Sequence, residues 1–134
     1  MNSMGQVFGV WTIRGRSTFA GSARPKVLTI RIEDHRGGEA LTVNTVAEDG
    51  RATTFSTILF FDGKAREFHD FSCSGTQKSR RLDRRAVEIL RECVGGRHIR
   101  LLRRDVQLGM LIFEITEQDG EGRRSEQRLF MEKH

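Results

Sequence analysis

Hydrophobic and polar residues alternate along much of this 134-residue chain. Within residues 26–33, for example, Leu28, Ile30 and Ile32 share one parity, and Thr29 and Arg31 have the other. A repeat of two is typical of a half-buried β-strand, whose successive side chains point to opposite faces of a sheet. The same pattern predicts strands at Val7–Arg14, Lys26–Glu33, Glu39–Glu48, Arg51–Phe61, Lys64–Ser72, Arg80–Asp83, Arg97–Arg104, Met110–Glu117 and Arg123–Lys133.

Two further stretches do not show a simple apolar alternation. Ser74–Ser79 is polar and is predicted to form a bend that leads into the next strand. Ala86–Val94 contains good helix formers, yet its alternate residues, among them Ile89, Arg91 and Cys93, also fit a strand. We favour a strand there, because the chain then continues as an uninterrupted meander.

Glycine-bearing turn signals separate most of the predicted strands. They are His35-Arg36-Gly37-Gly38, Asp49-Gly50, Asp62-Gly63, Gly95-Gly96 and Asp119-Gly120. Asp-Gly and Gly-Gly pairs supply the positive φ angles that tight hairpins require, so consecutive strands are expected to pair antiparallel. About ten short strands leave no room for a crossover helix, and an antiparallel sheet of that size normally closes on itself. The sequence therefore predicts one domain over residues 1–134, an all-β antiparallel up-and-down β-barrel of about eight to ten strands.

Composition adds limits on partners and location. The chain has 23 Lys+Arg against 18 Asp+Glu, a formal net charge of +5, which favours anionic ligands or surfaces. No apolar run approaches the ~18 residues needed to span a bilayer, and the first residues lack the pattern of a secretory signal. We therefore expect a cytoplasmic protein without a membrane partner, and leave homo-oligomerisation open.

The two cysteines, Cys73 and Cys93, have no metal-ligand spacing, and the four histidines are scattered along the chain. We expect two reduced, partly buried thiols, although a disulfide between them stays open because sequence does not give their separation in space. No metal site and no cofactor are predicted. Enzymatic motifs are absent as well, since Ser72-Cys73-Ser74 does not fit a nucleophile elbow, and we expect a protein that is not an enzyme.

Short motifs at both ends of the chain resemble a known superfamily. Gly9-Val10-Trp11 resembles the G-x-W of calycins, the superfamily of lipocalins and fatty-acid-binding proteins. Residues 127–133 are similar to the R-x-aromatic ending of the fatty-acid-binding branch, and the turns resemble those of small bacterial lipocalin-like proteins. The resemblance implies a barrel whose first and last strands pair. Gly9 and Trp11 would close one end, and an arginine of the closing strand would lie across the indole ring.

The resemblance also implies a ligand anchor. In fatty-acid-binding proteins the arginine of the terminal motif, with a tyrosine two positions on, holds the ligand carboxylate inside the cavity. Arg128 and Phe130 occupy those positions here, so the hydroxyl is missing. Residues 15–25 are also too short for the two-helix lid of that branch. Both departures argue against a long-chain fatty acid as the ligand.

The leading hypothesis is non-enzymatic binding of a small hydrophobic or amphipathic molecule inside the barrel. An anionic ligand would suit the positive residues of the chain. Arg128 and one of Arg100 or Arg103 would supply the positive charge, since these two lie on opposite parities of one strand. The apolar wall would come from Phe55, Leu59, Phe68, Phe113 (or its parity partner Ile112) and Phe130.

Two alternatives remain. Basic clusters at residues 78–81, 84–85 and 97–104 suit an interaction module that binds an acidic protein or RNA on its outer face. Nucleic acid is the less favoured partner, because the same region lacks aromatic residues for base stacking and is interrupted by acids. A haem-binding barrel, with His69 or His98 as axial ligand, is the weaker alternative.

Overall fold

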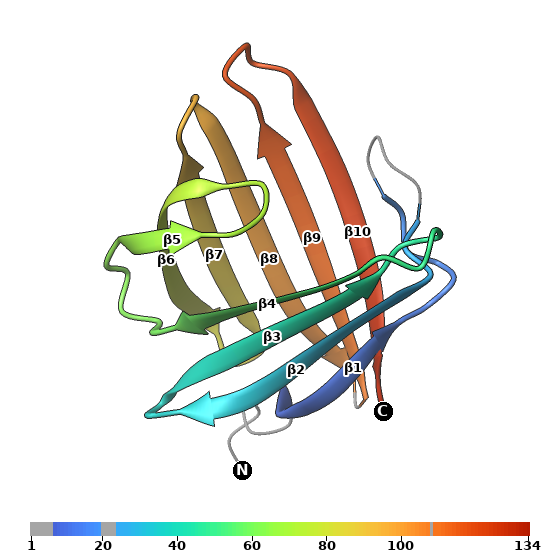
Figure 1. Ribbon diagram of the computed structural model, residues 1–134. Helices are drawn as coiled ribbons and strands as arrows, with labels where there is room; N and C mark the ends of the chain where they lie inside the picture. Colours follow the sequence, from blue (N-terminus) through green and yellow to red (C-terminus); the bar gives the residue numbers. More distant parts are fainter. Residues whose placement is uncertain (1–6, 20–23, 108) are drawn as a thin grey trace.

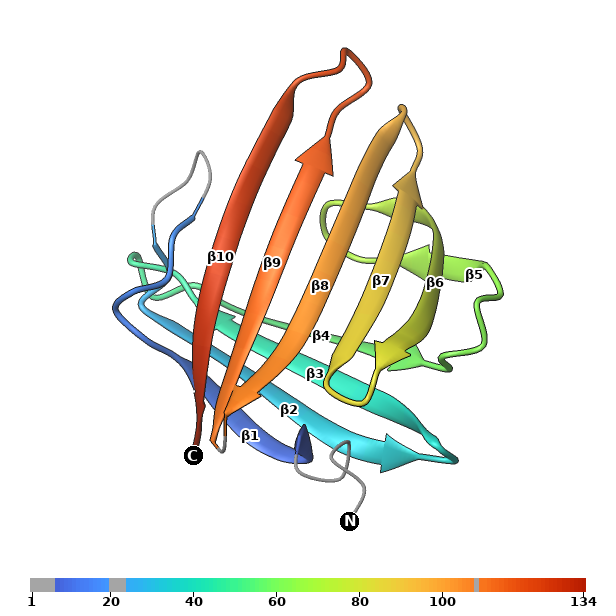
Figure 2. The same cartoon turned by 180° about the vertical axis from the view of Figure 1, so that it is seen from behind.

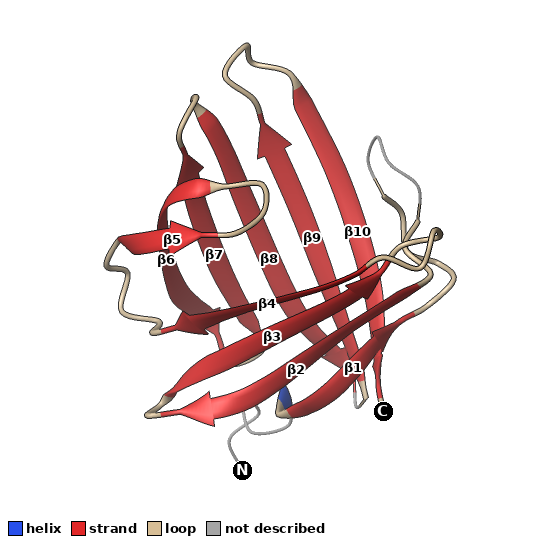
Figure 3. Ribbon diagram, viewed as in Figure 1, coloured by secondary structure: helices blue, strands red, loops and turns tan. Residues whose placement is uncertain are grey.

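Ten β-strands make up most of the chain, as Figure 3 shows. The structure is a computed structural model that describes residues 7–19, 24–107 and 109–134. In these ranges no helix is long and apolar enough to cross a membrane. The strands are β1 (Gly9–Ile13), β2 (Val27–His35), β3 (Gly38–Val46), β4 (Ala52–Leu59), β5 (Arg66–His69), β6 (Ser74–Asp83), β7 (Ala86–Cys93), β8 (Arg97–Gln107), β9 (Met110–Gln118) and β10 (Arg124–Lys133).

All ten strands belong to one antiparallel sheet in the order β4-β3-β2-β1-β10-β9-β8-β7-β6-β5. The first and last strands are neighbours, with Trp11 opposite Lys133. The sheet curls into a half-barrel in which β1–β4 cross β6–β10, in front of them in Figure 1 and behind them in Figure 2. Its two edges are β4 and β5, and just beyond β4 an isolated bridge joins Asp62 to Arg80 of β6. The predicted all-β, antiparallel up-and-down fold is confirmed.

The Asp-Gly turns owe their shape to the aspartate side chains as well as to glycine. In three of them a carboxylate oxygen of Asp49, Asp62 or Asp119 accepts the backbone N–H two residues further on, which forms an Asx turn. Gly50 has the expected positive φ of 86°. In the last hairpin the positive φ falls at Gly122 instead of the predicted Asp-Gly glycine.

One end of the half-barrel is tightly packed. Ile32, Leu59, Leu111 and Met131 have no exposed surface, and they form a core cluster with Trp11. These side chains come from both layers of the sheet, so the alternation predicted from the sequence places them on the shared inner face.

Trp11 lies at this packed end, and its indole N–H donates to the carbonyl of Val7 at 2.7 Å. The cation beside the indole ring is Lys133, whose Nζ is 5.7 Å from the ring centre. A lysine therefore takes the place where the resemblance implied an arginine, because Lys133 is the residue of β10 directly opposite Trp11.

The other end is less filled. Phe55, Leu101 and Ile115 are inner-face residues of β4, β8 and β9, but they are only partly buried and pack at the border of a second, smaller cluster. Since the buried residues of the packed cluster are at most 5% exposed, this difference means that solvent reaches the inner face here. The half-barrel is thus closed at one end and open at the other.

Two predictions need correction, and the first concerns Ser74–Ser79. This segment is not a bend but the first part of the continuous strand β6. The alternation is hidden there because the inner-face residues, Gln77 and Ser79, are polar although both are buried. Ala86–Cys93 forms strand β7, as favoured from the meander.

Strand β5 is also shorter than the predicted Lys64–Ser72 and covers Arg66–His69 only. The chain turns at Asp70, whose carboxylate oxygen accepts the backbone N–H groups of Ser72 and Cys73 at 2.8 and 2.6 Å. This local hydrogen bonding competes with strand pairing and ends the strand.

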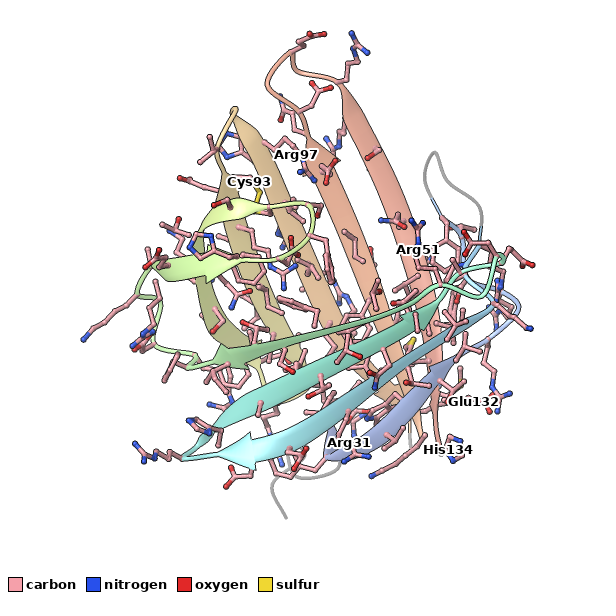
Figure 4. The ribbon with its side chains drawn as sticks, in the orientation of Figure 1. Arg31, Arg51, Cys93, Arg97, Glu132 and His134 are labelled. Atoms are coloured by element: carbon pink, nitrogen blue, oxygen red, sulfur yellow. A yellow bond between two sulfur atoms is a disulfide. The ribbon has the colours of Figure 1, made fainter. Side chains whose placement is uncertain are left out.

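Cys73 and Cys93 form a disulfide, so the expectation of two reduced thiols is wrong. Cys73 follows the Asp70 turn, and Cys93 ends β7 opposite Gly75 of β6, which brings the two Cα atoms to 5.1 Å. Both side chains are buried. Cys93 lies near the upper ends of β7 and β8 in Figure 4, at the open end of the half-barrel.

Candidate functional site

Three arginines of β7 and β8 share the parity of the inner face, and their partners differ. Arg103 donates two hydrogen bonds to Glu39 of β3, at 2.6 and 2.8 Å, and the two side chains are 2% and 0% exposed. Arg97 pairs with Glu117 of β9 at 2.7 Å and also donates to the carbonyl of Ser72. The charges of these two arginines are therefore neutralised within the protein.

Arg91 is the exception. Its Nε donates to Oε1 of Gln77 at 2.9 Å, and within the described ranges no carboxylate oxygen lies within 4.0 Å of its nitrogens. Burial lowers the pKa of Arg91 to about 10, while the more distant charge of Asp70 opposes that shift. A guanidinium in such a place lacks the counter-charge that would offset its burial.

Two aromatic rings flank this guanidinium. Its central carbon lies 4.3 Å from the ring centre of Phe68 and 5.8 Å from that of Phe55. The rings themselves meet edge to face, with centres 5.5 Å apart. We call Arg91, Gln77, Phe55 and Phe68 the Arg91 cluster. It adjoins the apolar residues Ile99, Leu101 and Ile115 and the disulfide.

Gln77 fixes the orientation of Arg91. Its Oε1 accepts from Arg91, and its Nε2 donates to Oγ1 of Thr57 at 3.0 Å, so both ends of the amide have partners. The guanidinium is held through Nε alone among the described residues, which leaves the two terminal nitrogens of Arg91 without a protein acceptor. Those nitrogens form the edge with which arginine binds a carboxylate, sulfonate or phosphate bidentately.

A hollow of about 220 Å³ adjoins the cluster in the gap between β4 and β5–β6. Gln77 and Thr57 lie at its inner side. The residues that line it are Thr57, Ile58, Phe60, Lys64, Arg66, Glu67, Gln77, Lys78 and Ser79.

The residues that the terminal motif suggested lie elsewhere, which corrects the sequence analysis. Arg128 is exposed on the outer face, where its guanidinium lies 5.4 Å from the ring centre of Phe130. The buried residues of β10 are Leu129 and Met131, so alternation turns Arg128 and Phe130 outward. Neither side chain points into the half-barrel.

The remaining predicted residues divide between the two ends. Of the β8 pair, Arg103 points inward and is paired, whereas Arg100 points outward and donates to Glu88 at 2.7 Å. Phe55 and Phe68 belong to the Arg91 cluster. Leu59 and Phe113 lie in the packed core, and Ile112 has the opposite parity to Phe113.

The two histidines proposed as haem ligands are both exposed. His69 is bonded through Nδ1 to the hydroxyl of Ser74 and through Nε2 to Glu67, each at 2.8 Å. His98 lies 4.0 Å from Glu92 on the outer face. Among the described residues no group of three or more His, Cys, Asp or Glu side chains is arranged to hold a metal ion.

Sequence reasoning missed Arg91 and Gln77 as site residues, and it missed Glu39 as the partner of Arg103. For Arg91 a signal was present, because it shares its parity with the apolar residues Ile89 and Cys93. For Gln77 the surrounding polar run concealed the strand. Comparison of the sequence with models of known protein families and with curated proteins finds no match.

Proposed function

We propose that this protein binds a small amphipathic anion at the Arg91 cluster, without catalysing a reaction. The observation that carries the proposal is the Arg91 guanidinium, which is largely buried and has no carboxylate partner among the described residues. The anionic group would bind the terminal nitrogens of Arg91. The apolar part would lie against Phe55, Leu101 and Ile115, the inner-face residues that remain partly exposed.

Physical chemistry favours an anion over a neutral ligand here. Hydrogen bonds that involve a charged group contribute about 1.5–3 kcal/mol, more than neutral ones, and the aromatic neighbours exclude water from the contact. Burial of a short hydrocarbon part against the apolar wall contributes about 25 cal/mol to binding for each Å² removed from water. An eight-carbon chain with one negative end is therefore a suitable probe. The resemblance to calycins supports the same proposal.

Binding of octanoate, octanol and octylammonium, measured by titration calorimetry, tests the choice of ligand. The three molecules share one chain length and differ in the charge of the end group. We expect octanoate to bind at least tenfold more tightly than the other two. Arg91→Gln should weaken octanoate binding roughly 10- to 100-fold, the loss of one charge-assisted contact. Octanol binding should hardly change.

Arg128→Gln is the matched control, since it removes the same charge from the outer face. It should leave octanoate binding unchanged. Equal affinity for the three ligands, or octanoate binding that survives Arg91→Gln, would exclude the Arg91 cluster as an anion site. Absence of octanoate binding to the wild-type protein would exclude the proposed function.

Gln77→Glu gives a second prediction with nearly the same side-chain shape. The introduced carboxylate would accept from Arg91 as the amide oxygen does, and it would also neutralise the guanidinium. We expect binding of octanesulfonate to fall at least tenfold at pH 7, while the free energy of unfolding does not decrease. Acidification below the pKa of the introduced carboxylate should restore binding, since octanesulfonate stays anionic. A variant that binds equally at both pH values contradicts the prediction.

The outer face of β6–β10 supports a second candidate, docking of an acidic protein segment. Arg80 and Arg100 share one carboxylate, Glu88, at 2.8 and 2.7 Å, so two cations face one acid. Hollows of about 300 and 540 Å³ lie beside these residues and beside Arg128. The two candidates predict opposite patterns. Docking of polyglutamate would weaken with Arg128→Gln and with added salt, and would be indifferent to Arg91→Gln.

A further inference from the structure

The hollow between β4 and β5–β6 reaches into the wall of the half-barrel as far as Gln77. Three pairs of consecutive strand residues line it: Thr57 with Ile58, Arg66 with Glu67, and Gln77 with Lys78. Consecutive residues of a strand point to opposite faces of the sheet. A hollow that touches both members of each pair therefore extends from the outer face toward the inner face. It opens where the sheet has its two edges, β4 and β5.

Gln77 separates this hollow from Arg91. Its side chain spans from β6 to β4, where Nε2 donates to Oγ1 of Thr57 at 3.0 Å and reaches the carbonyl of Ile58 at 3.5 Å. Its Oε1 is bonded to Arg91 on the inner side. Rotation of one buried amide would thus connect the outside with the unpaired guanidinium.

The outer rim of the hollow is positively charged. Lys64 and Lys78 have no ion-pair partner among the described residues. Asp62 binds Arg66 bidentately, at 2.9 and 2.6 Å, and the guanidinium holds the pKa of this carboxyl well below its usual value. Asp62 therefore stays ionised and offsets the charge of Arg66, which leaves the positive charge of the rim to the two lysines. Glu67 is the acid that lines the hollow, and it is engaged by His69.

We propose that the anionic ligand reaches Arg91 through this hollow, with Gln77 as the residue that must move to admit it. The inference rests on the proposed function. Along this route the negative group meets Lys64 or Lys78 first and Arg91 next, and it stays near a cation throughout. Through the open end it would instead pass the apolar Leu101 and Ile115, and the inner-face cation at that end, Arg97, is already paired with Glu117.

Stopped-flow binding of the fluorescent anion anilinonaphthalene sulfonate distinguishes the two routes. Ile58→Trp adds bulk at the outer mouth of the hollow without touching Arg91. We expect its association and dissociation rates to fall together, at least fivefold, with the dissociation constant within about twofold of wild type. Thr54→Trp is the control, since Thr54 is on the same outward face of β4 but does not line the hollow.

Two further variants separate the gate from the rim. Gln77→Ala should raise both rates several-fold, because the amide no longer bridges β6 and β4. The double variant Lys64→Gln with Lys78→Gln should slow association alone, and the difference from wild type should shrink as salt is added. Association that depends on these lysines while Ile58→Trp has no effect would limit their role to steering and would overturn the passage.

The outcomes separate the passage from the site. If the wild-type protein binds the probe with an affinity that depends on Arg91, and Ile58→Trp binds at wild-type rates, then the ligand uses the open end. The passage is overturned in that case while the proposed function stands. If the wild-type protein binds neither this probe nor octanoate, both proposals fail.

Discussion

Glu39→Gln is expected to lower the free energy of unfolding by about 3–5 kcal/mol, the usual effect of removing one partner of a buried ion pair. The replaced carboxylate is fully buried and accepts both hydrogen bonds of the Arg103 fork. Gln keeps the size of the side chain but leaves a desolvated guanidinium without a counter-charge. Urea denaturation followed by tryptophan fluorescence gives the measurement, since Trp11 lies in the packed core.

The double variant Glu39→Met with Arg103→Met shows whether the loss comes from an uncompensated charge. Apolar replacement of both partners is often nearly neutral, so we expect it to regain most of the stability that Glu39→Gln loses. Arg104→Met is the control, because Arg104 pairs with the partly exposed Glu114 at 3.5 Å and exposed pairs contribute about 0–1 kcal/mol. A loss below about 1 kcal/mol for Glu39→Gln would mean that water reaches the pair.

The fold could be predicted because its signals are local. Alternation marks each strand within a few residues, and Asp-Gly turns mark where the strands reverse. The same alternation already contained the position of Arg91, between the inward Ile89 and Cys93. It also placed Leu129 and Met131 on one face of the last strand, which turns Arg128 outward. In that strand the period of the sheet was a better guide than the short motif.

The partners of the inner-face charges could not be predicted, because they depend on how distant strands meet across the half-barrel. Glu39 and Arg103 are 64 residues apart in sequence, and neither has a local pattern that identifies the other. The pairing of Cys73 with Cys93 likewise depends on the Asp70 turn, which folds the chain back toward β7. Gln77 was hidden for another reason, since a buried polar residue removes the apolar alternation by which a strand is found.

Loss of the disulfide is expected to lower the free energy of unfolding by about 3 kcal/mol. The bond joins residues 20 apart in sequence, and a cross-link of that span restricts the unfolded chain by about this amount in the chain-entropy description. The double variant Cys73→Ala with Cys93→Ala should therefore unfold at lower urea concentration. It should also bind octanoate more weakly, because Cys73, Cys93 and Phe68 pack in one cluster beside Arg91.

Dithiothreitol provides the control for this prediction. It should shift the unfolding transition of the wild-type protein toward that of the double variant, and it should leave the variant itself unchanged. Equal stability of the wild-type protein with and without reductant would contradict the contribution of the bond.

Structural disulfides are rare in the reducing cytosol. A disulfide that stabilises the fold therefore favours an oxidising compartment over the cytoplasmic location expected from the sequence. Alkylation of free thiols in intact cells decides between them, because a chain held in an oxidising compartment would resist the reagent at both Cys73 and Cys93.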